Sequence, residues 1–211
     1  KITGDSTSEF VFGSISSAGD VNGDGFDDII VHGKEGYDGV FGAASGVTSV
    51  NVADVAIGIG GFKISDGVQD TTSSRATNVL GSGYGSSSAG DVNGDGFDDV
   101  IVGGGSEAYV VFGAASDISS VNVADVAMGI GGFVITNPTD LGAFIGLNFI
   151  DSVSSAGDVN GDGFGDLIVG VDGGQDGPAG NSNGAAYVVF GAASGTISVN
   201  LDDITLGVGG F

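Results

Sequence analysis

A nine-residue acidic string occurs three times in this chain and constrains its fold more than any other feature. Residues 20–28 read Asp-Val-Asn-Gly-Asp-Gly-Phe-Asp-Asp, residues 91–99 repeat that string, and residues 158–166 differ only at the eighth position, which is Gly165. Oxygen-bearing side chains stand at positions 1, 3, 5 and 9, with glycine at positions 4 and 6. This alternation is typical of a loop folded around a hard divalent cation, and we expect that cation to be Ca2+.

The predicted ligands are equivalent in the three strings. They are the side chains at positions 1, 3, 5 and 9 and the backbone carbonyl at position 7, whose phenylalanine ring we expect to enter the core. Position 9 is always aspartate while position 8 varies, so the ninth residue is expected to close the site and the eighth to be dispensable. With a water molecule, five such donors reach the six to eight oxygens that Ca2+ prefers. The predicted set is Asp20, Asn22, Asp24, Phe26 and Asp28; Asp91, Asn93, Asp95, Phe97 and Asp99; and Asp158, Asn160, Asp162, Phe164 and Asp166.

Two alternatives to this interpretation bear on the same strings. An EF-hand loop begins similarly but needs glutamate at position 12, where this chain has Val31, Val102 and Val169. A short β-branched run follows each string instead, which predicts a buried strand and places the loop between strands. The other alternative is a metal-free turn, because Asn, Asp and Gly also populate tight turns. Three carboxylates gathered without a cation would repel one another, which favours the metal.

Other landmarks recur with the strings and divide the chain into three units. A Val-Phe-Gly-Ala-Ala-Ser segment and a Gly-Gly-Phe segment follow each string in the same order. The units are residues 1–62, 63–133 and 134–211. We expect about four short strands in each: one after Gly-Gly-Phe, one after the string, one ending in Val-Phe-Gly, and one in the alternating Val-Asn-Val stretch. No segment holds helical periodicity, and 44 glycines in 211 residues disfavour helices further.

The fold class that these patterns predict is all-β. Four-stranded units at a period above about 40 residues are typical of β-propeller blades. A layer of such short strands cannot bury both faces alone, so the units are expected to stack on their neighbours.

The repeated residues resemble FG-GAP repeats, which are found in the β-propeller of integrin α subunits and in many large bacterial secreted proteins. The most specific element is Ala-Gly-Asp-Val-Asn-Gly-Asp-Gly-Phe, at residues 18–26, 89–97 and 156–164. The Phe-Gly pair of the family name is present as Phe12-Gly13 in the first unit only, and the Gly-Ala-Pro part is replaced in all three. The resemblance implies one blade per repeat, with a structural Ca2+ in the loop between the first two strands of each blade.

Three blades do not make a ring of the usual kind, because propellers generally close with four to eight. We therefore expect either a longer parent chain with further blades or a homodimer in which two half-rings complete six blades. The segment is expected to be a mature or excised part of an exported protein.

Composition narrows the environment and the partners. Four Lys and Arg against 27 Asp and Glu give a formal charge of −23, which disfavours nucleic acid and anionic lipid as partners. The chain has no cysteine, so calcium would replace disulfides as the cross-link of an extracellular or cell-surface protein. No apolar run approaches the 18 residues of a membrane span, so no membrane insertion is expected.

Nothing in the sequence predicts catalysis. The chain has one histidine, His32, and a nucleophile-elbow pattern at residues 180–184 lies in a polar stretch without strand or helix patterning. We therefore expect a calcium-binding structural or adhesion module that contacts a protein or a glycan. The alternative is a non-catalytic accessory propeller domain of a secreted enzyme acting on polysaccharide or lipid. Stretches where the units differ, at residues 66–81, 137–148 and 171–184, are the candidate contact loops.

Overall fold

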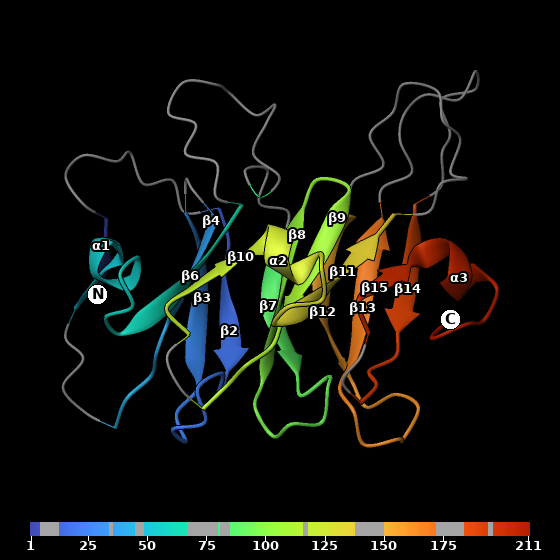
Figure 1. Ribbon diagram of the computed structural model, residues 1–211, viewed down its shortest axis with the longest axis horizontal. Coiled ribbons are helices and arrows are strands. Elements are labelled where there is room, and N and C mark those ends of the chain that lie inside the picture. The colour runs from blue at the N-terminus through green and yellow to red at the C-terminus, as the bar shows by residue number, and fades with distance from the viewer. Residues whose placement is uncertain are drawn as a thin grey trace.

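The computed structural model shows an all-β chain whose sheets follow one another along the sequence (Figure 1). The structure describes residues 1–4, 13–33, 36–44, 49–66, 80, 85–115, 118–137, 150–171, 184–193 and 196–211. Most of the three candidate contact loops lies outside these residues, and so does most of the nucleophile-elbow pattern. No helix in the described ranges is long and apolar enough to cross a membrane.

The first sheet is built around the apolar strand that follows the first acidic string. Its strands, in order across the sheet, are β10 (Ser120–Asn122), β6 (Gly61–Ser65), β4 (Gly36–Val40), β3 (Asp28–Gly33) and β2 (Ile15–Gly19). The pairs β6–β4, β4–β3 and β3–β2 are antiparallel. Ile30 and Val31 of β3 are fully buried, as predicted for a β-branched run.

The second and third units build sheets on the same plan. The second sheet is β15 (Ser198–Asn200), β11 (Gly132–Thr136), β9 (Glu107–Val111), β8 (Asp99–Gly104) and β7 (Gly85–Gly90). The third is β12 (Ile150–Gly157), β13 (Asp166–Val171) and β14 (Ala185–Val189), and β1 (Ile2–Thr3) pairs separately with β5 (Val50–Asn51). Each acidic string therefore joins two antiparallel strands, as predicted.

Each of the first two sheets ends with a strand that comes from the following sequence unit. The strand β10 runs parallel to β6, and β15 runs parallel to β11. The pair β1 and β5 is parallel in the same way. The unit boundaries after residues 62 and 133 fall inside β6 and β11, so the sheets and the sequence units are out of phase.

The Val-Asn-Val stretch forms the predicted strand, but the strand is short and an unpredicted helical turn follows it. The helices are α1 (Val52–Val55), α2 (Val123–Val126) and α3 (Leu201–Thr205). Asn51 caps α1 by accepting a hydrogen bond from the Ala53 N–H at 3.1 Å. Val52 and Val55 lie one turn apart and are both buried, so side-chain packing holds a helix too short to show periodicity.

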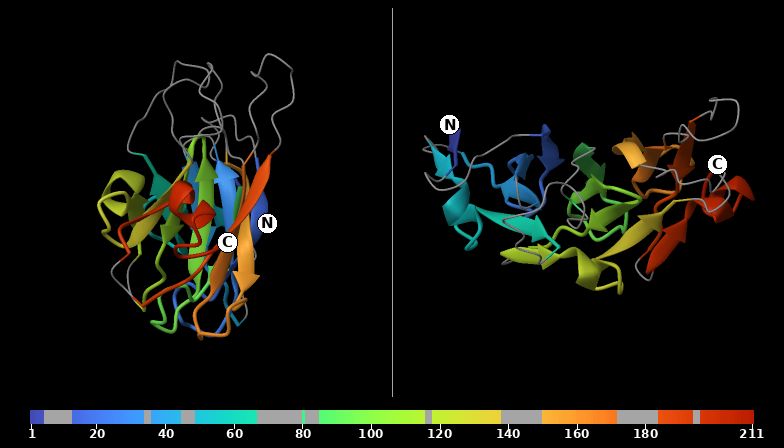
Figure 2. Two further views of the ribbon diagram at one scale, coloured as in Figure 1. Left: turned by 90° about the vertical axis from the view of Figure 1, so that its right-hand side faces the viewer. Right: turned by 90° about the horizontal axis from the view of Figure 1, so that it is seen from above.

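The core lies between sheets, which agrees with the prediction that the units stack. One cluster of buried side chains joins the first and second sheets, with Ile30, Phe62 and Val102 among its members. A second cluster joins the second and third sheets, with Ile101 and Val169 among its members. Seen from above, the three sheets follow an open arc with the chain ends at opposite sides (Figure 2). This arrangement is consistent with propeller blades, and the sheets do not close into a ring.

Candidate metal centre

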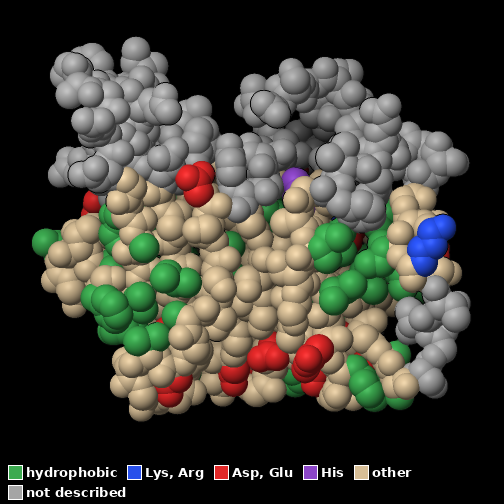
Figure 3. All heavy atoms as spheres, turned by 180° about the vertical axis from the view of Figure 1, so that it is seen from behind, with side chains coloured by type: hydrophobic (Ala, Val, Ile, Leu, Met, Phe, Trp, Pro, Cys, Tyr) green, Lys and Arg blue, Asp and Glu red, His purple; other side chains and the backbone are tan. Residues whose placement is uncertain are grey.

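The three acidic loops lie along one edge of the arc. They connect β2 to β3, β7 to β8 and β12 to β13, at the lower edge in Figure 1. Acidic side chains gather along the same lower edge in the view from behind (Figure 3). The repeat therefore places all three predicted sites on one rim of the molecule.

Hydrogen bonds from its own backbone shape the first loop. The Asp24 N–H donates to Asp20 Oδ1 at 3.0 Å and to Asn22 Oδ1 at 2.9 Å, so these two oxygens flank one nitrogen. Asp20 Oδ2 accepts from the Gly25 N–H, and Asp24 Oδ1 accepts from the Phe26 N–H. Gly23 and Gly25, at φ of 72° and 88°, let the backbone fold into the left-handed turns that bring these donors inward.

The same network recurs in the other two loops. In the second, Asp91 Oδ1 accepts from the Asp95 N–H at 3.0 Å, and Asn93 Oδ1 accepts from it at 2.8 Å. In the third, Asp158 and Asn160 share the Asp162 N–H in the same way, at 3.0 and 2.9 Å. The structure thus brings the predicted ligands at positions 1, 3 and 5 together in every loop.

The ninth residue occupies a different environment beneath the loop. Asp28, Asp99 and Asp166 are almost completely buried. Asp99 accepts hydrogen bonds from the N–H groups of Val92 and Gly113, both at 2.9 Å, and the other two aspartates make the equivalent pair of bonds. Position 9 therefore ties the start of its loop to the glycine that follows β4, β9 or β14. The sequence did not indicate this structural role.

Burial changes the acidity of two of these carboxyl groups. Desolvation raises the pKa of Asp28 to about 6 and that of Asp99 to about 7. Backbone hydrogen bonds partly oppose the rise in pKa, and the carboxylates at positions 5 and 1 of the same loop add to it. A bound cation would favour the ionised form that burial disfavours.

The arrangement fits a hard cation in its chemistry, although its carboxylates face backbone N–H groups. In the part of the chain that the structure describes, no three acidic or histidine side chains converge as a metal cluster. The atoms that would bind the cation are nevertheless carboxylate and amide oxygens. Each has a second lone pair, and the loop that carries them is already folded. Within the same ranges, no donor reaches the carbonyl oxygens of Phe26, Phe97 or Phe164.

The phenylalanine at position 7 does not enter the core, so that prediction is wrong. The Phe97 ring lies against Gly23 of the preceding loop, where an added Cβ would overlap it, and the Phe164 ring lies against Gly94 in the same way. Both rings are half-buried, whereas Phe26 is 40% exposed. In the second and third strings the ring at position 7 therefore packs against the preceding loop and not in the core.

Position 8, which was expected to be dispensable, has a structural role in the second loop. Asp98 Oδ2 accepts a hydrogen bond from the Asp20 N–H at 2.9 Å and so links the second loop to the first. Gly165 has no side chain for this bond, although its N–H donates to the Asp91 carbonyl at 2.8 Å. The variation at position 8 was the available signal, because it marks a residue with a contact outside its own loop. We call the contact between consecutive acidic loops a joint.

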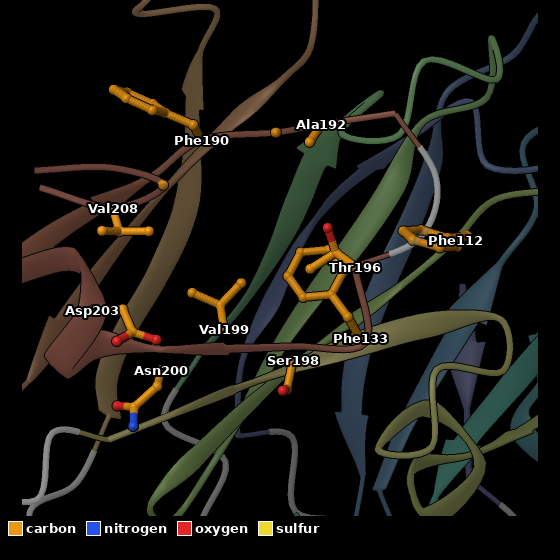
Figure 4. Close-up of a pocket in the computed structure, with 12 residues that line it drawn as sticks. Phe112, Phe133, Phe190, Ala192, Thr196, Ser198, Val199, Asn200, Asp203 and Val208 are labelled. Atoms are coloured by element: carbon orange, nitrogen blue, oxygen red, sulfur yellow. The ribbon is translucent and has the colours of Figure 1, made fainter.

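Outside the loops, the described residues include a buried histidine and an apolar pocket. His32 is buried, its Nε2 lies 3.1 Å from the Leu80 carbonyl, and burial lowers its pKa. A pocket of about 220 Å³ lies between the second and third units and is lined largely by apolar side chains, including Phe133 and Val208 (Figure 4). Its Asn200 side chain caps α3, accepting from the Asp202 N–H at 2.9 Å.

Comparison with known proteins agrees with this architecture. A family model described as the FG-GAP repeat matches residues 12–44, 83–116 and 149–189, which together make up just over half of the chain. A search of curated proteins gives no significant match. FG-GAP repeats are typically non-catalytic structural modules, and they occur generally in extracellular or surface proteins. With three matches in register with three acidic loops and three sheets, the chain belongs to the FG-GAP repeat family.

Proposed function

We propose that this chain is a calcium-binding structural module of a secreted or cell-surface protein, in which three Ca2+ ions rigidify a β-propeller. The observation that carries the proposal is the threefold recurrence of one loop geometry. In each loop, oxygens at positions 1 and 3 share the N–H of position 5, and a buried aspartate at position 9 holds the loop to its strand. A merely tolerated turn would not keep four oxygen-bearing residues in three copies.

Each ion would be held by oxygens alone. The ligands would be the side chains at positions 1, 3, 5 and 9 and the carbonyl at position 7 of each loop, the set predicted from the sequence. When bound, the ion supplies positive charge and cross-links the two ends of its loop. The chain itself contributes the folded loop, because its glycine turns and backbone hydrogen bonds hold the side chains at positions 1, 3 and 5 together.

The position of the loops supports a structural role. Every loop lies at a joint or at the end of the arc, so an ion there would stiffen the contact between neighbouring sheets. The formal charge of −23 and the absence of cysteine leave this chain with strong self-repulsion and no covalent cross-link. Three divalent ions would relieve the repulsion where acids are most concentrated.

The open arc of sheets also bears on the larger assembly and its use. An open arc of three sheets needs further blades, from a second copy or from a longer parent chain, before it becomes a propeller ring. The ring would present protein-binding or glycan-binding loops without acting as an enzyme. The strong negative charge makes nucleic acid an unsuitable ligand.

Calorimetric titration of metal-free protein with CaCl2 tests the proposal. We expect three ions per chain, with dissociation constants of roughly 10⁻⁴ to 10⁻³ M, the range of extracellular modules. Replacing Asp162 by Ala should reduce the number of ions to two. The matched control is Asp125→Ala, which removes an exposed acid of α2 and should leave three. Absence of calcium-specific binding, or equal loss in both variants, would contradict the proposal.

A further inference from the structure

The two joints inside the chain are built from the same contacts. In the first, Phe97 covers Gly23, and the Asp98 N–H donates to the Asp20 carbonyl at 3.2 Å. In the second, Phe164 covers Gly94, and the N–H of the following residue donates to the first carbonyl of the loop. A further N–H closes each joint: Ala114 N–H donates to the Val21 carbonyl and Ala192 N–H donates to the Val92 carbonyl, both at 3.0 Å.

The first and third sheets carry the two complementary halves of such a joint. On the first sheet, Phe26 is 40% exposed and Asp27 is exposed, whereas their counterparts in the second sheet are half-buried. On the third sheet, Val159 is 50% exposed, although the equivalent Val21 and Val92 are buried. Among the described residues, no atom lies within 4 Å of a Cβ built on Gly161, the position that a phenylalanine covers in the other two loops.

The strand pairing shows the same complementarity. The strands β4 and β9 each pair along their length with a fourth strand, β6 or β11. In the described residues, β14 has only an isolated bridge from Val189 to Gly210 on that side. At the other end of the arc, β1 pairs in parallel with β5, as β6 pairs with β10. The pair β1 and β5 therefore matches the strand pair beside β4 and β9, of which β14 has only that bridge in the part of the chain that the structure describes.

We propose that the third sheet of this chain binds the first sheet of a second copy through a third joint of the same construction. Phe26 of the second copy covers Gly161, and its Asp27 and Ala43 N–H groups donate to the carbonyls of Asp158 and Val159. The copy's β1 and β5 extend the sheet beside β14. The two ends lie at opposite sides of the arc, so two copies arranged head to tail satisfy both ends and close a ring (Figure 2).

Position 8 explains why a second copy suits this surface. Asp98 makes the side-chain bond to the loop before it, and Gly165 cannot. Asp27 has the side chain of Asp98, so the third joint reproduces the contacts of the first joint and includes the carboxylate bond, here to the Asp158 N–H. The first sheet of the second copy thus supplies the carboxylate bond that Asp98 makes in the first joint and that Gly165 cannot make in the second.

This assembly rests on the proposed structural function, because the joint forms between two loops proposed to hold calcium. Sedimentation equilibrium of the 211-residue chain in 5 mM CaCl2 and 150 mM NaCl tests it. We expect a species of about 41 kDa, twice the chain mass of 20.4 kDa. A monomer at all concentrations up to 100 µM would overturn the assembly. Calorimetric calcium binding by the same sample separates this failure from failure of the proposed function.

Single substitutions locate the contact, and matched controls lie close by. Gly161→Asn places a side chain where Phe26 should pack, and Gly163→Asn introduces the same left-handed residue two positions away, where no neighbour lies near the equivalent Gly25 or Gly96. We expect Gly161→Asn to weaken dimerisation at least tenfold and Gly163→Asn to change it less than threefold. Equal effects would overturn the assigned surface.

Mixing two defective variants tests the head-to-tail arrangement. Phe26→Ala alters the half of the joint on the first sheet, and Gly161→Asn alters the half on the third sheet. Each variant alone is therefore expected to be monomeric at 20 µM. A mixed pair retains one intact joint and should form a heterodimer, detectable by sedimentation with one partner labelled. Met128→Ala, which removes an exposed apolar side chain of the middle unit, should leave dimerisation unchanged. Failure of the mixture to associate would refute the head-to-tail contact.

Discussion

The joint between the first two loops makes a strong prediction, because one glycine and one ring can be changed separately and together. Phe97 is half-buried against Gly23, 74 residues away in the sequence. Replacing a fully buried phenylalanine by alanine costs about 3–5 kcal/mol of unfolding free energy, so Phe97→Ala should cost about 2 kcal/mol. In a chain of this size that corresponds to a fall in Tm of roughly 4–8 °C.

The reverse change tests the same contact from the glycine side. Gly23→Ala costs about 1 kcal/mol for placing a Cβ at φ 72°, and overlap with the Phe97 ring adds about 2 kcal/mol. Gly25→Ala is the control, because Gly25 also has positive φ and no atom of the described residues lies within 4 Å of an added Cβ. In the double variant Gly23→Ala with Phe97→Ala, the overlap disappears. The loss of unfolding free energy in the double variant should therefore be about 2 kcal/mol smaller than the sum of the two single-variant losses.

Urea unfolding followed by far-ultraviolet circular dichroism measures these differences at fixed calcium. A common slope among the variants allows the midpoints to be compared as free energies. Additive losses in the double variant, within about 0.5 kcal/mol, would refute the contact. So would equal losses for Gly23→Ala and Gly25→Ala, because backbone strain alone would then account for both.

Three further predictions concern the metal, the buried acids and the first sheet. Asp95→Ala should lower stability by about 2–3 kcal/mol in 10 mM CaCl2, for a site with a Kd near 10⁻⁴ M, and by less than about 1 kcal/mol in chelator. Asp125→Ala is the control, and equal losses for Asp95→Ala in both buffers would exclude a metal role. Burial raises the pKa of Asp28 to about 6 and of Asp99 to about 7, so the metal-free folded state binds protons more tightly than the unfolded chain. The Tm of the metal-free protein should therefore rise as pH falls from 8 to 5, whereas the Tm of the calcium-bound protein should fall. Parallel trends in the two samples would contradict this prediction. Tyr37→Phe should cost about 1–2 kcal/mol by urea unfolding, because the buried hydroxyl lies 2.7 and 3.1 Å from two backbone carbonyls of the second sheet; an unchanged midpoint would show that these bonds do not matter.

What the sequence predicted well was local. The strand after each string and the loop that gathers positions 1, 3 and 5 follow from residues that are close in the sequence, and the repeats follow from the recurrence of that local pattern. The one-turn helix α1 could not be predicted, because four residues are too few to show helical periodicity. An asparagine cap and two buried valines hold α1, and burial of Val52 and Val55 depends on the sheet beneath them.

What the sequence did not predict depends on contacts between distant residues. The packing of Phe97 on Gly23 and the bond from the Asp20 N–H to Asp98 both cross from one unit to the next. No periodicity within a unit distinguishes a ring that enters the core from one that covers a neighbouring loop. The burial of Asp99 was equally hidden, since an aspartate beside a strand reads as a loop ligand until the strand's packing is known.

The joints also predict an order among the three proposed calcium sites. A ring covers the loop glycine at position 4 in the first two loops, whereas no described residue of the same molecule covers Gly161 of the third. A loop held in its folded shape loses less conformational freedom on binding an ion, so the two covered loops should bind calcium more tightly than the third. Calorimetry on monomeric Phe26→Ala protein tests this order. Adding Asp162→Ala should remove the weakest binding step there, whereas loss of the tightest step would show that the cover does not preorganise the site.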